Sequence, residues 1–272
     1  MLDYIKSELK KLNIEYVSCL SLEDCEIVRP YLLEKQNISS GSVVIFAVPY
    51  LTRESAGERN ISSYAVSKDY HIFFKNLFED LTAKLKNKYP QYKFAGFSDH
   101  SPINEIKAAA KSGIGLIGMN HLLITEKYSS YVFIGEIITD AILPSTPQSI
   151  THCIDCKKCV LACPINLDVT KCLSEATQKK APLSSDEISN IKSSGCVWGC
   201  EICQEVCPYT IKAKENKTIF TDIEFFKNNQ ISIVSSNNIE NMNEESFSQR
   251  AYSWRGKNVI LRNIKLIEGE DD

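Results

Sequence analysis

Several features are missing from this sequence, and each absence argues against a class of protein. No stretch approaches the roughly 20 consecutive apolar residues that a membrane-spanning helix needs. Residues 1–6 contain no apolar run of the signal-peptide type, so we expect a cytoplasmic protein with no membrane contact. An excess of positive charge is also lacking. The formal net charge is −3, so any contact with RNA has to come from a local basic patch.

The composition is that of a soluble globular protein. Of 272 residues, 43% are hydrophobic and 24% are charged, which is enough apolar material for the core of one large or two modest domains. The chain has 11 cysteines and no secretion signal. This combination fits a reducing compartment, where thiolates stay available to bind metal.

Seven of these cysteines fall in two runs whose spacing is typical of iron–sulfur proteins. Residues 153–164 read C-x2-C-x2-C-x3-C-P, the pattern of two-cluster bacterial ferredoxins, and residues 200–208 read C-x2-C-x3-C-P. The short gaps let one backbone turn aim neighbouring thiolates at one cluster, whereas the longer gap directs the last cysteine to the other cluster. The proline that follows stops the turn. The spacing therefore predicts two [4Fe–4S] clusters.

Two such clusters need eight thiolates, so one ligand must come from outside the runs. The candidates are Cys172, nine residues after Cys163, and Cys196, four residues before Cys200. We favour Cys172. The predicted ligands of one cluster are Cys153, Cys156, Cys159 and Cys207, and those of the other are Cys163, Cys172, Cys200 and Cys203.

Other interpretations of these residues are weaker. Two structural zinc ions would also use C-x2-C pairs, but zinc sites do not usually carry a Cys-Pro closure on both runs. A disulfide framework is typical of small secreted chains in an oxidising compartment. The four histidines show no metal-ligand spacing, so we expect them to be hydrogen-bonding residues of the surface or core.

The first 150 residues alternate between helical and strand patterns. Apolar residues at helical spacing predict helices near residues 2–12, 70–85 and 103–111, the last with Ser101 as a candidate N-cap and Pro102 at its first position. Short apolar runs predict strands over residues 43–48, 92–97, 121–125 and 131–138. This alternation predicts a layered α/β or α+β domain.

A glycine motif and two acids in this region bear on function. Residues 113–118 spell G-x-G-x-x-G, but the motif follows a predicted helix, whereas a dinucleotide fingerprint opens one. A tight turn, or a backbone passing close to a bulky flat ligand, fits the glycines better. Asp99 stands where a strand ends and a helix begins, a place where ligands often meet the chain, although a capping or solvated acid would look the same. Glu105, in the first turn of that helix, suits the helix dipole.

The C-terminal part is polar, with one basic helical segment. Residues 177–194 predict an exposed helix-loop link between the cysteine runs, and residues 214–248 are rich in asparagine. Residues 248–266 predict a helix with the basic and aromatic side chains Arg250, Tyr252, Trp254, Arg255, Lys257, Arg262 and Lys265. Such a helix can contact RNA phosphates, or it can simply be a solvated face with snorkelling stems.

Six blocks together resemble the cobalamin-dependent epoxyqueuosine reductases, a family related to the reductive dehalogenases. They are residues 42–50, 61–71, 98–105, 113–120, 128–137 and the double cysteine run. The cysteine run alone is shared with many ferredoxins. The pattern Asp99-x-x-Pro102-x-x-Glu105, together with the block at 128–137, is far more specific. The resemblance covers about residues 40–210.

The resemblance implies an oxidoreductase that reduces the epoxide of epoxyqueuosine in a tRNA anticodon loop to queuosine. The N-terminal domain would hold cobalamin, and the clusters would pass electrons to it one at a time. The family's proton-donating Asp falls on Asp99, which makes chemical sense because a leaving epoxide oxygen needs a proton. The implied cobalamin contacts are Tyr70, His71, Gly113, Gly115, Gly118, Asn120, Tyr131, Val132 and Phe133. We expect a monomer whose electron donor is a reduced ferredoxin or flavodoxin.

This reading divides the chain into three parts. We expect an α/β cobalamin-binding domain at residues 1–147, a ferredoxin-like double-cluster domain at 148–213, and a polar linker with a short helical tail at 214–272.

Three positions and the C-terminus depart from the family's pattern. Leu116 stands where the family usually has Trp, Met119 where it has Lys, and Ser63 where it has Arg. The family also adds a long helical-repeat tail, of which residues 255–267 resemble only the beginning. Two alternative functions therefore stay open. One is a cobalamin and iron–sulfur reductase of a small molecule, and the other is a two-cluster electron-transfer protein without cobalamin.

Overall fold

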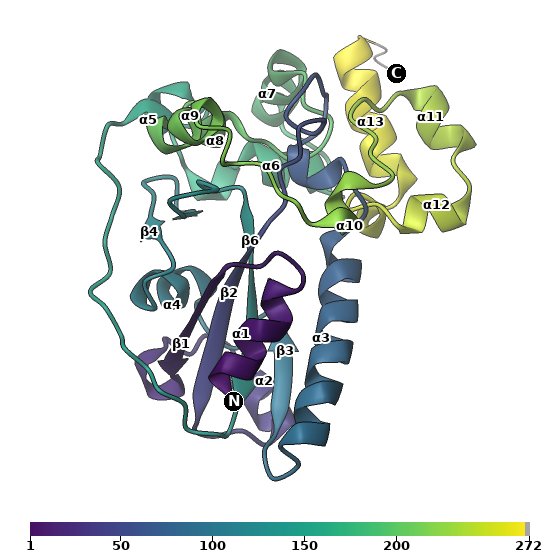
Figure 1. Cartoon of the computed structure of the whole chain (residues 1–272). Helices are drawn as coiled ribbons and strands as arrows, with labels where there is room; N and C mark the ends of the chain where they lie inside the picture. The colour runs from purple at the N-terminus through teal and green to yellow at the C-terminus, as the bar shows by residue number, and fades with distance from the viewer. Residues whose placement is uncertain (270–272) are drawn as a thin grey trace. The chain divides into compact units, whose positions relative to one another are not determined.

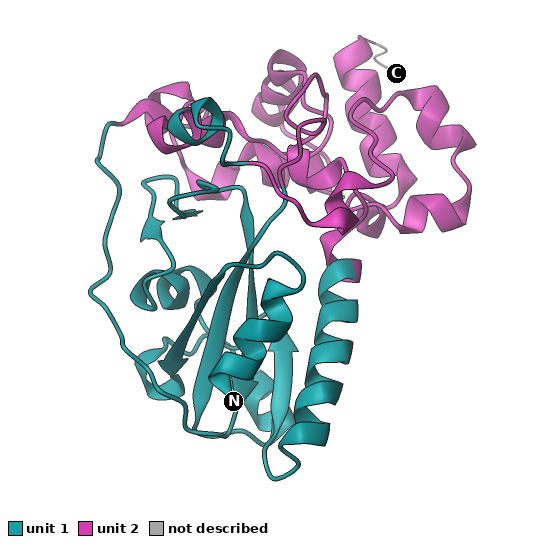
Figure 2. Ribbon diagram, viewed as in Figure 1, with its two compact units in different colours: residues 1–50, 73–156, 212–219 teal, residues 51–72, 157–211, 220–272 magenta. Residues whose placement is uncertain are grey.

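The chain is divided into two compact units whose segments alternate along the sequence. The computed structural model describes residues 1–269 (Figure 1). Unit 1 comprises Met1–Tyr50, Phe73–Cys156 and Lys212–Ile219, and unit 2 comprises Leu51–Ile72, Lys157–Ile211 and the residues from Phe220 onward (Figure 2). The domain boundaries predicted at residues 147 and 213 stay a prediction.

Unit 1 is built on a four-stranded antiparallel sheet. Its strands lie side by side in the order β1 (Tyr16–Ser21), β2 (Ser42–Pro49), β6 (Val132–Thr139) and β3 (Phe94–Phe97). Strand β2 is buried along its whole length, as its continuous apolar run predicts. In the register, Phe97 at the end of β3 lies opposite Glu136 of β6, so the loop after β3 begins beside the first half of β6.

Helices pack on one face of this sheet against alternate residues of β2. Val43, Ile45 and Ala47 share an apolar core with residues of α2 (Pro30–Gln36) and α4 (Glu105–Lys111). The period of two along a strand places these three side chains on one side. Helix α4 therefore presses directly on the sheet, just after the loop that carries Asp99.

The opposite face of the sheet is covered by α3 (Tyr70–Lys88). The ring of Phe46 lies 6.5 Å from the rings of both Phe74 and Phe78 of this helix, measured between centroids. A Cβ atom at Gly135 would lie 2.5 Å from the Phe46 ring, so only glycine lets the aromatic layer approach the strand. Helix α1 (Leu2–Lys10) lies beside α3 (Figure 1), and Lys84 of α3 contacts Glu8 of α1 at 2.9 Å.

A small hairpin follows α4 in unit 1. Strands β4 (Leu116–Ile117) and β5 (Leu123–Ile124) pair in an antiparallel two-stranded sheet. The glycine motif occupies the approach to this hairpin and its first strand, so it follows a helix and precedes a strand, as predicted.

Unit 2 is made of short helices around an apolar core. This core contains Trp198, Tyr252 and three residues of the last helix, Val259, Ile260 and Ile264. The helices are α5 (Lys158–Ala162), α6 (Leu173–Gln178), α7 (Ser185–Ser194), α8 (Ile202–Glu205), α9 (Pro208–Glu215, which extends into unit 1), α10 (Glu224–Lys227), α11 (Ser236–Asn241), α12 (Glu244–Ser248) and α13 (Lys257–Glu268). No helix among residues 1–269 is both long and apolar enough to span a membrane.

Two local expectations were wrong. The N-cap of α4 is Asn104, whose side chain accepts the Lys107 N–H, because the Ser101 hydroxyl instead accepts the Ile103 N–H and donates to Glu136. The single helix expected over residues 248–266 is interrupted. Gly256 has a φ of +85°, a conformation that helical residues do not adopt, and α13 starts after it.

Candidate functional site

Asp99 lies at the tip of the loop between β3 and α4 in unit 1. Its φ of +62° places it in the left-handed region, which Asp tolerates better than most residues. Two hydrogen bonds fix the loop on either side of its carboxyl group. The Ser98 hydroxyl donates to the Ile134 carbonyl oxygen of β6 at 2.9 Å, and the Asp99 N–H donates to Oε1 of Glu105 at 2.9 Å. The side chain of Asp99 is exposed, as a proton donor to a bound substrate must be.

The start of the strand beside this loop is only partly covered. The residues of β6 from Gly135 onward are buried, whereas Val132, Phe133 and Ile134 at its start are only half-buried. The Phe133 ring packs on the Tyr50 ring, with 4.5 Å between their centroids. Val132 and Ile134 lie on the face of the sheet that α4 covers, and Phe133 lies on the face of α3. A half-exposed end of an apolar strand next to an exposed acid fits a flat apolar group such as a corrin ring.

A second acid lies buried behind the Asp99 loop. Glu136 of β6 is fully buried, and its Oε2 accepts a hydrogen bond from the Ser101 hydroxyl. Its Oε1 has no hydrogen-bond partner among residues 1–269. Burial, and then the negative charge of Glu105, raise the pKa of Glu136 well above its usual value.

Glu105 lies between this buried acid and Asp99. It is the first residue of α4, and its carboxyl group accepts the Asp99 N–H. Burial, and then the charge of Asp99, raise the pKa of Glu105 to about 8, against the smaller opposing effects of the Asp99 N–H and the Arg29 charge. Three carboxyl groups therefore gather where β3 ends and α4 begins, and two of them are held mainly protonated at neutral pH.

The predicted cobalamin contacts in the glycine motif have roles within the chain itself. A Cβ atom at Gly115 would lie 2.5 Å from the Ile124 carbonyl oxygen, and one at Gly118 would lie 2.3 Å from Oδ1 of Asn120. Gly113 has a φ of +81° and follows the end of α4. The hairpin thus requires these glycines for its tight turn, and their contact with a corrin ring stays a prediction.

The remaining predicted contacts are divided between the units. Tyr131, which is buried, lies in unit 1 directly before Val132 and Phe133. Tyr70 and His71 lie in unit 2, where their rings stack with 4.2 Å between centroids and Nδ1 of His71 lies 2.8 Å from the Asp69 carboxylate.

The first two cluster cysteines belong to unit 1, and Cys153 is bonded to the hairpin. The Cys153 N–H donates to the Ile117 carbonyl oxygen at 3.1 Å, and the Met119 N–H donates to the Cys153 sulfur at 3.3 Å. Cys156 is exposed. Hydrogen bonds to a cysteine sulfur are typical of iron–sulfur ligands, where they tune the reduction potential. Met119, which departs from the family's usual Lys, contributes here through its backbone alone.

The other cluster cysteines lie in unit 2, at the ends of short helices. Cys159 lies in α5 and Cys203 in α8, and these two helices pack together. Cys163 follows α5, Cys172 precedes α6, Cys200 precedes α8 and Cys207 precedes α9. All 11 cysteines are free thiols, so the donor set for two cubane clusters is present.

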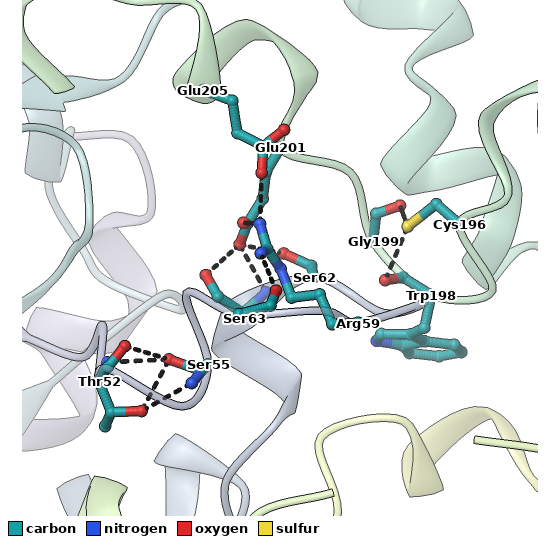
Figure 3. A network of polar contacts seen from close by, with 11 residues as sticks. Thr52, Ser55, Arg59, Ser62, Ser63, Cys196, Trp198, Gly199, Glu201 and Glu205 are labelled. Atoms are coloured by element: carbon teal, nitrogen blue, oxygen red, sulfur yellow. Dashed lines mark hydrogen bonds and ion pairs between the residues drawn. The ribbon is translucent and has the colours of Figure 1, made fainter. Parts of the chain in front are cut away.

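The two candidates for the eighth ligand both lie near Cys200. Burial raises the pKa of the Cys200 thiol to about 12, and the thiols of Cys196, Cys203 and Cys172 are close enough to add to the effect. The Cys196 thiol, however, donates to the backbone carbonyl oxygens of Trp198 and Gly199, at 3.5 and 3.2 Å. Cys196 is thus already bonded within its own loop (Figure 3), which favours Cys172 as the ligand.

A network of polar contacts holds the segment that carries Cys200. Figure 3 shows Glu201, the next residue, at its centre. One carboxylate oxygen accepts hydrogen bonds from the Ser62 hydroxyl at 2.6 Å, from the Ser63 N–H at 2.7 Å and from the Ser63 hydroxyl, and the other pairs with Arg59 at 2.8 Å. Arg59 also pairs with the more exposed Glu205. Ser63, where the family usually has Arg, therefore anchors the cluster segment as a hydrogen-bond donor.

The basic C-terminal residues are only partly available to a partner. Arg250 is buried and donates to the Asn229 carbonyl oxygen at 2.6 Å, and Arg262 donates to the Lys179 carbonyl oxygen at 2.7 Å. Trp254 is 57% exposed, and the Arg255 guanidinium group lies 3.7 Å from the centre of its ring. The predicted RNA-contacting face is thus reduced to this pair and its immediate neighbours.

Two important acids escaped sequence analysis. Glu136 had one available signal, a single charge inside the apolar run at residues 131–138. Glu201 gave none, because its partners Ser62, Ser63 and Arg59 lie more than a hundred residues earlier in the chain.

Comparison with known proteins places the chain in a family. The family model "Epoxyqueuosine reductase QueG, DUF1730" matches residues 35–100, and the model "4Fe-4S dicluster domain" matches residues 152–211. The chain belongs to the epoxyqueuosine reductase family. The predicted family and the predicted two-cluster iron–sulfur domain are both confirmed.

Individual epoxyqueuosine reductases resemble the chain to different extents. The protein of Lactococcus garvieae is 24% identical over 97% of this chain and 86% of its own length. Those of Gloeobacter violaceus and Synechocystis sp. are each 32% identical, over 64% and 65% of this chain and 57% and 66% of their own lengths. The chain therefore spans less than two thirds of most of the curated relatives compared first.

Solved structures of epoxyqueuosine reductases share the fold. The enzyme from Streptococcus thermophilus superposes with a TM-score of 0.79, at 22% identity, over 97% of this chain and 80% of its own. A crystal structure of epoxyqueuosine reductase with an epoxyqueuosine-modified tRNA-Tyr stem loop gives a TM-score of 0.77 at the same identity and coverage. The predicted mixed α/β fold class is confirmed.

Proposed function

We propose that the chain reduces the epoxide of epoxyqueuosine in a tRNA anticodon loop to the alkene of queuosine. The observation that carries this proposal is the exposed carboxyl group of Asp99, which is fixed on its loop beside a half-exposed apolar strand in a chain that also has a dicluster domain. The epoxyqueuosine reductase relatives supply the substrate class.

The reaction must balance two electrons and two protons. Both C–O bonds of the epoxide break, a carbon–carbon π bond forms, and the oxygen leaves as water. Asp99 donates a proton to the departing oxygen, which would otherwise leave as a poor, strongly basic group. The two clusters carry the electrons one at a time from an external donor.

The residues present fit both cofactors. One cluster would be held by Cys153, Cys156, Cys159 and Cys207, and the other by Cys163, Cys172, Cys200 and Cys203. The residues that would hold a corrin ring are Tyr70, His71, Tyr131, Val132, Phe133, Asn120 and the glycines of the hairpin. Cobalamin, when bound, supplies a strongly reducing cobalt centre, while the protein orients the substrate and donates protons.

The partners follow from this chemistry. We propose that the chain acts as a cytoplasmic monomer, takes electrons from a reduced ferredoxin or flavodoxin, and binds the anticodon loop of tRNA. The stacked pair Trp254–Arg255 is the exposed aromatic and cationic element in unit 2 that suits an unpaired base or a phosphate.

Anaerobic reconstitution tests the proposal against its two alternatives. The protein is loaded with iron, sulfide and cobalamin, and then supplied with tRNA from cells blocked at the epoxide. Cobalamin uptake with conversion of epoxyqueuosine to queuosine is the expected result. Cobalamin uptake without conversion would favour a reductase of a small molecule, and failure to take up cobalamin would leave only a two-cluster electron carrier.

A further inference from the structure

The reaction needs more protons than one acid can deliver in a single pass. Each turnover consumes two protons, and the carboxyl group of Asp99 can pass on only one at a time. A second proton must reach either the departing oxygen or an Asp99 carboxylate that has already given its proton away. Because the substrate has to cover Asp99 to receive a proton from it, bulk water is displaced from that side. The second proton is therefore expected to come from behind the loop.

The structure places two acids behind this loop, a half-buried Glu105 and a fully buried Glu136. Glu105 accepts the Asp99 N–H at 2.9 Å, so the two residues are held together by a direct contact. Glu136 lies further inside, fully buried, with the Ser101 hydroxyl on one carboxyl oxygen and no partner among residues 1–269 on the other. A buried acid without a cation is costly as a carboxylate, so it keeps its proton.

We propose that Glu105 resupplies Asp99 with a proton and that Glu136, behind it, holds a further proton in reserve. This inference rests on the proposed function, since it assigns to Glu105 and Glu136 the second proton of the epoxide reduction. Glu105 acts through Asp99 in two ways. It positions Asp99 by accepting the Asp99 N–H, and it returns a proton to the Asp99 carboxylate. In their folded environment both acids have raised pKa values, with that of Glu105 at about 8, so they are protonated when the cell interior is near neutral.

The charged groups around Glu105 and Glu136 do not prevent these two acids from holding their protons. Asp99 faces Glu105 from the loop, and its charge favours the protonated form of Glu105. Arg29, which precedes α2, has the opposite but smaller effect, and its guanidinium group donates to the Ser101 carbonyl oxygen at 3.0 Å. Cys25 faces Glu136, whose charge helps to raise the pKa of the Cys25 thiol to about 12 after the larger effect of burial, so this thiol does not ionise near neutral pH.

A cavity lies next to Cys25, the residue that faces Glu136. Cys25 lines a cavity of about 530 Å³ in unit 1, together with Lys107 and Lys111 of α4. Both lysines are paired with acids, Lys107 with Glu26 at 2.7 Å and Lys111 with Asp24 at 2.9 Å. We place the route by which Glu136 regains its proton on this side, through the position of Cys25, because Glu136 itself is fully buried and does not line the cavity.

Two substitutions at Glu105 separate proton supply from positioning. Glu105→Gln keeps a side-chain oxygen that accepts the Asp99 N–H but cannot release a proton, whereas Glu105→Ala loses both roles. We expect Glu105→Gln to lower the single-turnover rate at neutral pH by about 10²-fold, within the range for a lost proton-transfer group. The wild-type rate should fall as pH rises through about 8, and this fall should be absent in Glu105→Gln.

Infrared titration of the cofactor-free protein gives a readout independent of turnover. The C=O stretch of a protonated carboxyl group should disappear near pH 8 in the wild type and be missing in Glu105→Gln. Glu136→Gln should leave that band near pH 8, because Glu136 stays protonated there and places no negative charge beside Glu105. The exposed Glu79→Gln, on α3, is the matched control and should change neither the spectrum nor the rate.

The possible results distinguish this inference from the proposed function. If Asp99→Asn abolishes turnover while Glu105→Gln keeps the wild-type rate and pH profile, the proton reserve is refuted and the Asp99 assignment stands. Absence of any carboxyl band titrating above the ordinary range would likewise refute the reserve. Normal turnover by Asp99→Asn would instead overturn the proposed role of Asp99 itself.

Discussion

Two buried acids, one in each unit of the molecule, are held in opposite ways. Glu201 in unit 2 has hydrogen bonds from Ser62 and Ser63 and a salt bridge with Arg59 at 2.8 Å. Glu136 in unit 1 has one hydroxyl partner and, instead of a cation, a neighbouring carboxyl group.

The difference separates a structural acid from a chemical one. A buried carboxylate with a cation and several donors is fully satisfied, and it holds chain segments together without exchanging protons. A buried carboxyl group without a cation, whose pKa is raised by burial and then by a neighbouring acid, holds its proton and is a candidate for proton transfer. Unit 2 therefore uses its acid to fix cluster ligands, and unit 1 uses its acids to hold protons.

The largest expected effect is the loss of the proton donor in unit 1. Asp99→Asn should lower the rate of epoxide reduction by about 10²–10⁴-fold, because the amide cannot donate the proton that the departing oxygen needs. Single-turnover kinetics on modified tRNA measure this loss. The visible spectrum of the clusters should be unchanged, and Asp80→Asn, an exposed acid of α3, should behave as the wild type.

The next effect concerns the eighth cluster ligand, in unit 2. Cys172→Ser should remove one of the two clusters and so about half of the bound iron, since a cubane needs four protein thiolates. Cys196→Ser should keep the full iron content, because its thiol is bonded to the Trp198 and Gly199 carbonyl oxygens. Iron and sulfide analysis of the two variants checks this directly, and the reverse pattern would make Cys196 the eighth ligand.

Breaking the satisfied network in unit 2 should cost stability. Glu201→Ala leaves Arg59 and two serine donors without their acceptor, so we expect a loss of about 3 kcal/mol in the free energy of unfolding. Glu205→Ala removes the second, 44% exposed partner of Arg59 and should cost less than about 1 kcal/mol. Denaturant unfolding compares the two variants, and equal losses would show that the network is not anchored at Glu201.

The smallest effect is a pH dependence that belongs to unit 1. The folded-state pKa of Glu105, about 8, lies above the ordinary value of 4.5, so the folded state binds this proton more tightly than the unfolded state. Its contribution to stability is complete below pH 4.5 and is lost as pH rises to about 8. As pH rises between these limits, the free energy of unfolding of the wild type should fall by on the order of 2 kcal/mol relative to that of Glu105→Gln. This figure allows for the partial exposure of the Glu105 side chain. Urea unfolding of both proteins across this window measures the difference, and parallel pH profiles would contradict it.

The parts of the site that sequence analysis predicted are those set by local patterns. The cysteine runs are visible because cluster ligands follow one another at fixed short spacing, and Asp99 is visible because it stands where a strand ends. The helices and strands over residues 43–48, 70–85 and 131–138 follow from periodicity in the same way. Strand β1 and helix α2 were missed, since their apolar residues are few and interrupted by polar ones.

The parts that escaped prediction depend on contacts between distant residues. Ser101 and Glu136 are 35 residues apart, and Arg59 and Glu201 are 142 apart. No spacing rule connects such positions, so the two roles of a buried acid can be distinguished only once the chain is folded. The antiparallel order of the sheet, which brings the start of β6 beside the Asp99 loop, is likewise a property of the fold.

The most direct test of the central claim is the mass of the modified nucleoside after one turnover. Protein carrying both clusters and cobalamin, reduced and mixed with an epoxyqueuosine-containing tRNA stem loop, should yield a nucleoside lighter by one oxygen atom, with one water released for two electrons consumed. An unchanged nucleoside mass, from protein whose spectra show intact clusters and bound corrinoid, would contradict the account.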